Sequence, residues 1–444
     1  MRELVERVAP QRSPNPREAC LTRPTSLKAQ SLTADTSEWR AVIDHGDAQA
    51  TNHGPLMAIP AAIASNLSVR CFVASFLAFL LPGAVTPTGA SARPSTSTEA
   101  IERRVRGELK TFTDWLDENS AHGFIGEVGW PTKDRPQRVD WNAVADGWFR
   151  DADAAGLWVT TWATGEWWGT DYNLAPYEDE RPSPGVDSAT PQAKVVEAHR
   201  TTRRYLRGVN VAGGEFGGPG GSTDSFSNTN PGSYDHTYHY DAAETFTYLA
   251  QRGVKLVRIP FRWERLQPHL GAPLDEAELE RIRRVVGRAR ASRLRVVLDM
   301  HNFGAYYLSD GKQGIRRPIG SSQVTSAHFN DVWLRISAAF RDNPGVIGYG
   351  LMNEPVGLPG SERVHPAQVW ERASQGALST IRRSGDRKLI LVSGYAWSGV
   401  QEWSRQHPVP WITDIGDNHR YEAHHFWDRD HSGDYAEPVG TRRR

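Results

Sequence analysis

The fold is decided by residues 254–300, which contain VKLVRIPF at 254–261, DEAELERIRRVVGRAR at 275–290 and LRVVLDM at 294–300. The first and last segments are short apolar runs rich in branched residues, which favour buried β-strands. In the middle segment apolar residues recur at steps of three and four, which indicates an amphipathic helix. This order predicts two parallel strands joined by a helix that covers them.

Six further apolar runs of the same kind lie on both sides of this segment. They are 124–128 (FIGEV), 157–163 (LWVTTWA), 208–212 (GVNVA), 346–352 (VIGYGLM), 389–394 (LILVSG) and 421–427 (YEAHHFW). Amphipathic segments between the runs include 332–341 and 366–383. Eight strands alternating with helices predict an α/β protein with a single (β/α)8 TIM barrel, whose strands are apolar because both faces are buried.

The chain is short of one helix at its end. Only 17 residues follow Trp427, too few for a loop and a covering helix. A good amphipathic helix, however, precedes the first strand at 98–119. We expect this leading helix to cover the gap after the last strand, since barrel termini lie close together.

Polar residues cluster where the predicted strands end, which is the face where barrel active sites form. Two of them are carboxylates: Glu354 in LMNEP and Glu127 in GEVG. Arg258, His301, His424 and Trp162 are carried by other strands. Two carboxylates across a polar pocket suit cleavage of a glycosidic bond, although each glutamate taken singly fits a surface or ion-paired residue as well.

A metal site is the competing interpretation of the segment around residue 424. Five residues with metal-ligand side chains gather there: His424, His425, Asp428, Asp430 and His431. Strand alternation sends His424 and His425 to opposite faces, and no H-E-x-x-H or cysteine pattern supports zinc. We therefore expect no metal and no cofactor.

Seven segments together resemble the cellulase-type members of glycoside hydrolase family five, and they cover almost all of residues 101–435. They are GVNVAGGEF, RGVKLVRIPFRWERLQP, VVLDMHNFGAYY, IGYGLMNEPVG, YEAHHFWDRDHSGDY, GFIGEVGWP and WVTTWATGEWWG. In the family the last two segments belong to strands seven and eight, whereas here they come first. The order resembles a circular permutation. A fragment spanning two tandem copies is the alternative, but each family strand is present once.

The resemblance implies a retaining mechanism with Glu354 as acid/base and Glu127 as nucleophile. It implies substrate-binding or supporting roles for Arg258, His301, Asn353, His424 and Trp162, and further sugar contacts for Trp397 and Trp168. Trp263 and Trp427 fit either sugar subsites or core packing. Asp299 is expected to orient the backbone near His301. A cis peptide bond is expected after Trp162.

One residue departs from the family. Phe426 stands where the family has a tyrosine that bonds the nucleophile, so activity is expected to fall or the role to pass to His425 or another subsite residue. The resemblance implies an endo-β-1,4-glucanase, with a mannanase, xylanase or β-1,3-glucanase as alternatives. A carbohydrate-binding pseudoenzyme also stays open. The loops 213–234 and 311–322 are expected to shape the groove.

The N-terminal region predicts secretion. Residues 68–92 combine Arg70, an apolar run at 71–81 and a small-residue cleavage site at 90–92 (ASA). We predict an extension or wrong start at 1–56, a signal peptide at 57–92, a linker at 93–98 and the catalytic barrel at 99–444. Cleavage removes Cys20 and Cys71, the only two cysteines, and with them any disulfide or thiol nucleophile.

The charge balance gives no sign of a nucleic-acid or membrane partner. The chain has 52 basic and 52 acidic residues, so no long-range field favours nucleic acid or anionic membranes. The resemblance implies a β-glucan or related polysaccharide as the substrate. We expect a monomer that has no membrane contact after signal cleavage.

Overall fold

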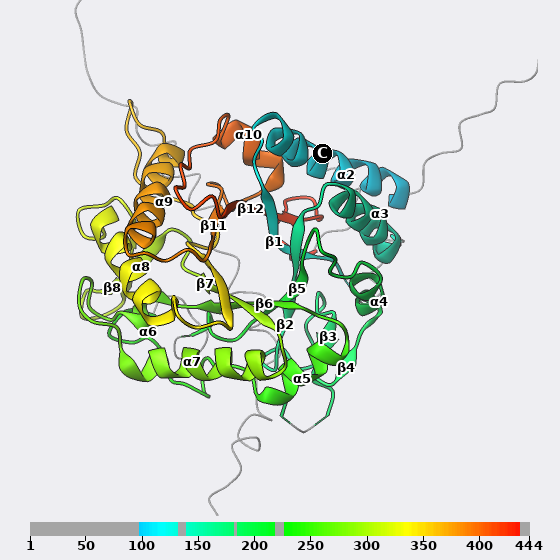
Figure 1. The fold of residues 1–444 in the computed structure, drawn as a ribbon, viewed down its shortest axis with the longest axis horizontal. Coiled ribbons are helices and arrows are strands. Elements are labelled where there is room, and N and C mark those ends of the chain that lie inside the picture. Colours follow the sequence, from blue (N-terminus) through cyan, green and yellow to red (C-terminus); the bar gives the residue numbers. More distant parts are fainter. Residues whose placement is uncertain (1–96, 132–138, 182–183, 218–225, 436–444) are drawn as a thin grey trace, which may run out of the picture. The chain divides into compact units, whose positions relative to one another are not determined.

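Eight parallel strands form the closed barrel that the sequence predicts (Figure 1). They are β1 (Gly123–Gly129), β2 (Trp158–Thr164), β5 (Arg207–Val211), β6 (Leu256–Phe261), β7 (Arg295–Met300), β10 (Val346–Gly350), β11 (Leu389–Ser393) and β12 (His419–Phe426). Hydrogen-bonded neighbours follow the order β1-β12-β11-β10-β7-β6-β5-β2, and β2 pairs with β1 to close the ring. The structure is a computed structural model that describes residues 97–131, 139–181, 184–217 and 226–435.

All eight predicted strands are confirmed, with ends that differ by at most two residues. β1, β5, β6 and β11 are buried along their whole length, as expected of strands covered on both faces. A cluster that includes Phe124, Leu256, Val297 and Leu389 lies among the first residues of the strands and fills the amino end of the barrel. Polar side chains therefore fall toward the carboxyl end, where they form the site described below.

Helices surround the barrel, and the described ones are α2 (Ser97–Glu118), α3 (Trp141–Ala154), α4 (Pro191–Ala198), α5 (Ala243–Gln251), α6 (Trp263–Leu266), α7 (Glu276–Ala291), α8 (Ser326–Phe340), α9 (Pro366–Arg383), the 3-10 turn η4 (Val400–Glu402) and α10 (Trp403–Gln406). The predicted helix at 366–383 matches α9, and the one at 275–290 is α7 moved by one residue. The predicted helix at 332–341 is only the second half of α8. That helix begins earlier because Thr325 and His328 form a capping box.

The leading helix α2 covers the seam after β12, as predicted (Figure 1). Phe112 packs against Trp403 with ring centroids 4.7 Å apart, and Trp115 packs edge-on against Tyr421 at 5.1 Å. Arg104 donates a 2.6 Å hydrogen bond to the backbone oxygen of Trp427. The first described helix and the last strand are therefore held together by both apolar and polar contacts.

The two loops expected to shape the groove contact each other. Residues 305–318 form a hairpin of β8 (Ala305–Ser309) and β9 (Gly314–Pro318). The backbone nitrogen of Asn228 donates to the oxygen of Tyr307, and its side-chain oxygen accepts from the nitrogen of Ser309, both at 2.9 Å. A second small sheet pairs β3 (Tyr177–Glu178) with β4 (Ser188–Ala189).

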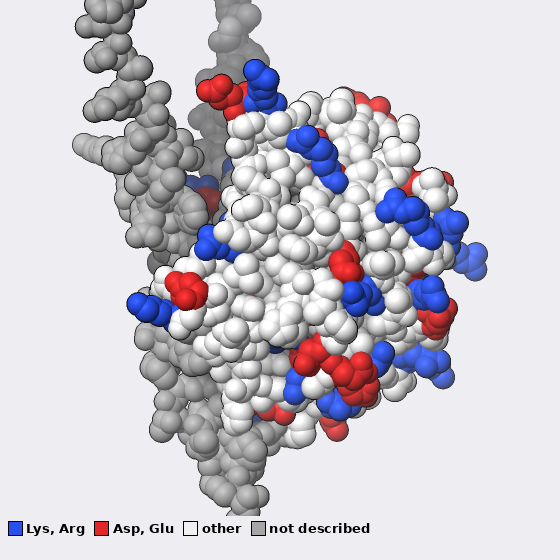
Figure 2. Space-filling view, turned by 90° about the vertical axis from the view of Figure 1, so that its left-hand side faces the viewer, with Lys and Arg blue, Asp and Glu red and all other residues white. Residues whose placement is uncertain are grey.

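The surface and the N-terminal predictions can be compared with the described residues only. On the face in Figure 2, basic and acidic side chains are interspersed and neither sign gathers in one patch. Among the described helices, none has the length and apolarity needed to cross a membrane. The predicted signal peptide, both cysteines and residues 218–225 of the first groove loop lie outside the described residues.

Candidate active site

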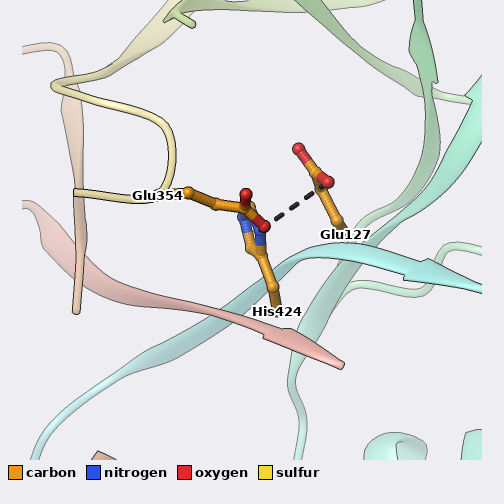
Figure 3. A group of neighbouring side chains, drawn as sticks. All are labelled: Glu127, Glu354 and His424. Atoms are coloured by element: carbon orange, nitrogen blue, oxygen red, sulfur yellow. Dashed lines mark hydrogen bonds and ion pairs between the residues drawn. The ribbon is translucent and has the colours of Figure 1, made fainter. Parts of the chain in front are cut away.

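Three side chains from distant parts of the chain converge at the carboxyl end of the barrel (Figure 3). Glu127 lies on β1, Glu354 follows β10 and His424 lies on β12, where the strand register sets it beside Glu127. One oxygen of each carboxylate and one imidazole nitrogen all lie within 4.8 Å of one another. Carboxyl groups stand about 5–5.5 Å apart in retaining glycosidases and about 6.5–9.5 Å apart in inverting ones, so the spacing matches the retaining arrangement.

The two carboxylates have different neighbours. Glu127 is 4% exposed and accepts a 3.1 Å hydrogen bond from Arg258. Glu354 has a 14% exposed side chain, and its Oε1 lies 2.8 Å from Nδ1 of His424. Its φ of 45° is uncommon for a residue other than glycine and is typical of functional sites. Arg258 therefore favours the ionised form of Glu127.

Arg258 is the centre of the buried polar network beneath the pair. Its guanidinium group is fully buried and also donates to Asn210 and Asn353 at 2.9 and 2.7 Å. Two further carboxylates contact it, Asp299 at 2.9 Å and Glu422 at 3.1 Å. A planar group with five donors is the side chain best suited to hold so many acceptors in fixed positions.

The network holds more acidic than basic groups, so it keeps protons near neutral pH. Burial raises the pKa of Glu127 to about 8, despite the nearby cations of His424 and Arg258, and raises that of Asp299 to about 7. Burial alone lowers the pKa of His424, but the carboxylates of Glu127, Glu354 and Glu422 raise it to about 10. His424 is therefore an imidazolium ion near neutral pH.

His301 is held in one tautomer by a chain of hydrogen bonds. Its Nδ1 lies 2.9 Å from Asp299 and its Nε2 lies 3.2 Å from the amide nitrogen of Asn353. Burial lowers the pKa of His301 well below its usual value, so the ring is neutral and Nε2 accepts from Asn353. Asp299 thus orients the imidazole ring and Arg258, whereas the expectation that it orients backbone was wrong.

Trp162 stands beside His301 with its ring nearly parallel, at 5.5 Å between centroids and 18° between planes. The peptide bond between Trp162 and Ala163 is cis, as predicted. The indole N–H of Trp162 donates a 2.8 Å hydrogen bond to the hydroxyl of Tyr172. Tyr172 therefore fixes the ring that the resemblance places under the sugar.

Of the other tryptophans considered for sugar contacts, Trp397 is exposed and Trp168, Trp263 and Trp427 are buried. Trp397 is 41% exposed, with its ring centroid 5.9 Å from that of Phe303. Trp168 is 3% exposed, and one face of its ring is covered by Tyr172 at 3.9 Å. Trp263 and Trp427 are fully buried and belong to the core, which decides the two alternatives left open for them.

The segment around residue 424 confirms the strand alternation. His424 points into the site, whereas His425 points outward to Glu108 at 3.0 Å and accepts a 3.0 Å hydrogen bond from Trp148. The idea that His425 replaces the missing tyrosine was therefore wrong. Phe426 is 8% exposed and lies at the end of β12, where its register partner is Gly129.

Three polar residues of the site were missed by the sequence analysis: Asn210, Glu422 and Tyr172. Asn210 and Glu422 lie within strands that were taken as apolar runs. Counting back by two from His424 would have placed Glu422 on the same inward face. Tyr172 lies in a loop after β2, where no periodic pattern exists to indicate a direction.

The barrel and its close carboxylate pair together define a class, the (β/α)8 proteins with the geometry of retaining glycosidases. The comparisons narrow the class to one family. The family model "Cellulase (glycosyl hydrolase family 5)" matches residues 207–442, more than half of the chain, and the chain belongs to that family.

Named relatives share about a quarter to a third of the aligned residues. The chain is 28% identical to the manganese dependent endoglucanase Eg5A of Phanerodontia chrysosporium, over 52% of this chain and 55% of that protein. It is 27% identical to endo-beta-1,4-glucanase B of Emericella nidulans, over 53% and 65%. A solved endo-beta-1,4-glucanase from Xanthomonas axonopodis pv. citri is 35% identical over 52% and 68%, with a TM-score of 0.44. The chain thus spans about half the length of the first of these relatives.

Proposed function

We propose that this protein hydrolyses β-glycosidic bonds in a β-1,4-linked glucan, acting within the polymer and retaining the anomeric configuration. Glu127 is the nucleophile and Glu354 the acid/base. The observation that carries the proposal is the unequal environment of two carboxylates within 4.8 Å: one faces Arg258 and the other faces His424. Family membership and the names of the relatives support the choice of a β-1,4-glucan.

In the first step Glu127 attacks the anomeric carbon while Glu354 donates its proton to the departing glycosidic oxygen. The bond between the sugar and Glu127 forms as the glycosidic bond breaks. In the second step Glu354 takes a proton from water, which attacks the same carbon and releases Glu127. Arg258 favours the ionised form of Glu127 that the attack requires.

The surrounding residues bind the sugar at the cleaved bond. Trp162 forms a platform whose ring is fixed by Tyr172. The side-chain amide of Asn353 donates one N–H to His301, and the second N–H of Asn353 can bond the sugar 2-hydroxyl. Trp397, exposed at the rim, is suited to stack on a further sugar ring.

Hydrolysis of a panel of soluble polysaccharides tests the proposal. We expect new reducing ends and a rapid fall in viscosity with β-1,4-glucan, and less or none with mannan, xylan or β-1,3-glucan. Faster turnover of one of the last three would assign that substrate instead. Binding of the glucan without turnover of any substrate would identify a carbohydrate-binding protein and overturn the proposal.

Two substitutions with a matched control assign the roles. Glu127→Gln and Glu354→Gln should each reduce the rate severely. Azide should restore part of the lost rate in a variant only if the substituted residue is a catalytic carboxylate that azide can replace. Glu278→Gln is the control. Glu278 lies on α7 and is as buried as Glu127, but it accepts hydrogen bonds from the hydroxyls of Tyr238 and Tyr240, away from the pair. It should keep its activity after correction for the folded fraction.

We further propose that the barrel is a circular permutant. The family match begins at residue 207 with β5, yet β1 and β2 precede it and complete the ring between β12 and β5. A single cooperative unfolding transition of monomeric protein, with activity lost in the same transition, is expected. Assembly of two chains through exchanged strands would instead favour a piece of a tandem array.

Secretion is proposed from the N-terminal sequence. Residues 57–92 form the signal peptide, 93–98 a linker and 99–444 the catalytic barrel, while 1–56 lie before the true start. N-terminal sequencing of the protein exported by its host should begin after Ala92. A mature protein that retains residue 71 would contradict this processing.

A further inference from the structure

Glu422 is a third glutamate beneath the catalytic pair, and it contacts both cations that serve the pair. Its side chain is fully buried on β12. Oε1 lies 3.1 Å from Nε of Arg258 and 3.6 Å from Nε2 of His424, while Oε2 lies 3.4 Å from the hydroxyl of Ser393. The two ring nitrogens of His424 are thereby divided between two carboxylates, Glu354 and Glu422.

The chain makes room for this carboxylate next to the nucleophile. Gly126 precedes Glu127 on β1, and a Cβ atom at position 126 would stand 2.0 Å from Oε1 of Glu422. Any side chain there would push Glu422 away from Arg258 and His424. The glycine before the nucleophile therefore serves the position of a residue on the neighbouring strand.

We propose that Glu422 is a positioning residue for the reaction, which holds the imidazolium of His424 and the guanidinium of Arg258 in place and keeps His424 charged. This inference rests on the proposed function for its catalytic meaning, although the charge of His424 can be measured without it. Because Glu422 is fully buried and contacts Arg258 and His424, it acts through these two partners.

The direction of the effect follows from the charges that surround Glu422. Among the described residues, Arg258 of β6, Asp299 of β7 and His424 on its own strand are charged groups that act on it, and Ser393 of β11 adds a neutral contact. Removal of the Glu422 charge takes one of three anions from His424 and leaves Glu127 and Glu354. The imidazolium is then easier to deprotonate, so the pKa of His424 falls.

Glu422→Gln tests the inference, since it removes the charge and keeps the shape. In the resting enzyme, the titration of the His424 ring followed by nitrogen NMR should move to lower pH by about one unit or more. The basic limb of the kcat/KM profile should move in the same direction. KM should stay near its original value while kcat falls, because the sugar contacts are unchanged.

Two further variants separate positioning from stability. Asp386→Asn is the matched control: Asp386 is a buried carboxylate that accepts from Ser337 and Tyr349 at 2.8 and 2.9 Å, away from the site. It should leave the His424 titration and the pH profile unchanged. Glu422→Asp keeps the charge and should recover part of the shift.

The outcomes distinguish this inference from the proposed function. A folded Glu422→Gln protein with an unmoved His424 titration overturns the inference, even if the enzyme is active. If Glu422→Gln does not fold, Glu422→Asp decides instead. Its shorter side chain moves the carboxylate away from His424, so the titration of His424 should move slightly to lower pH. A titration that does not move also overturns the inference. An inactive original protein refutes the function, while the NMR titration still decides the role of Glu422.

Discussion

Arg258→Lys is the substitution that separates the geometry of the guanidinium group from its charge. Arginine contacts Glu127, Asp299 and Glu422 through different nitrogens and also bonds two asparagines. A lysine ammonium group keeps the positive charge but has one nitrogen, so it cannot reach all of these acceptors. We expect the bond to Glu127 to be lost or lengthened.

The size of the effect follows from that one contact. A hydrogen bond to a charged group contributes about 1.5–3 kcal/mol, which corresponds to a fall in kcat/KM of about 10- to 150-fold. Because the cation withdraws from Glu127, the pKa of this carboxyl rises further above its usual value, and the acidic limb of the activity profile should move to higher pH. The assay is kcat/KM for an aryl β-cellobioside across pH, together with thermal unfolding.

Arg382→Lys is the control for the loss of a buried guanidinium group. Arg382 of α9 is similarly buried, and it pairs with Asp414 at 2.7 and 2.9 Å and not with either catalytic glutamate. It should lower the melting temperature without moving the pH profile. If folded Arg258→Lys keeps kcat/KM within a factor of about two and its acidic limb does not move, less than about 0.5 kcal/mol is involved and the reasoning is refuted.

Three further predictions concern the platform, the departure from the family and the seam. Tyr172→Phe removes the acceptor of the Trp162 indole N–H and should lower kcat/KM about fivefold, as expected for one neutral hydrogen bond; unchanged kinetics would show that the ring needs no such support. Phe426→Tyr restores the tyrosine that the resemblance expects to bond the nucleophile; it should raise kcat about fivefold and move the acidic limb to lower pH, because a donor to Glu127 favours its ionised form, and a slower enzyme with an unmoved limb would contradict this. Phe112→Ala in α2 should lower the free energy of unfolding by about 3–5 kcal/mol in urea titrations, and a loss below about 1 kcal/mol would mean that α2 does not close the barrel.

Sequence patterns predicted the strands because barrel strands are apolar throughout. Each of the eight runs forms one strand, and the spare helix before the first of them covers the seam. The start of α8 was placed too late, since its first turn is set by the capping contact between Thr325 and His328 and not by apolar periodicity. The hairpin β8–β9 was missed because β9 lies in the predicted insertion at 311–322 and β8 directly precedes it.

The candidate site was predicted near the strand ends and at Arg258, whereas Asn210 and Glu422 inside the strands were missed. Glu127, Glu354, His301 and His424 stand near strand ends, where polar residues contrast with the apolar run before them. Glu422 sits inside such a run, and an interior carboxylate is tolerated only because Arg258 lies beside it. Strand alternation could have placed Glu422 on the inward face, but its contact with Arg258 comes from another strand and has no local pattern.

The central claim is that Glu127 attacks the sugar. An activated 2-deoxy-2-fluoro β-cellobioside traps a glycosyl-enzyme because the fluorine slows its hydrolysis, and peptide mass spectrometry then locates the bound sugar. The account predicts one adduct, on Glu127, which is absent from Glu127→Gln. An adduct on Glu354, or turnover that gives products of inverted configuration, would contradict it.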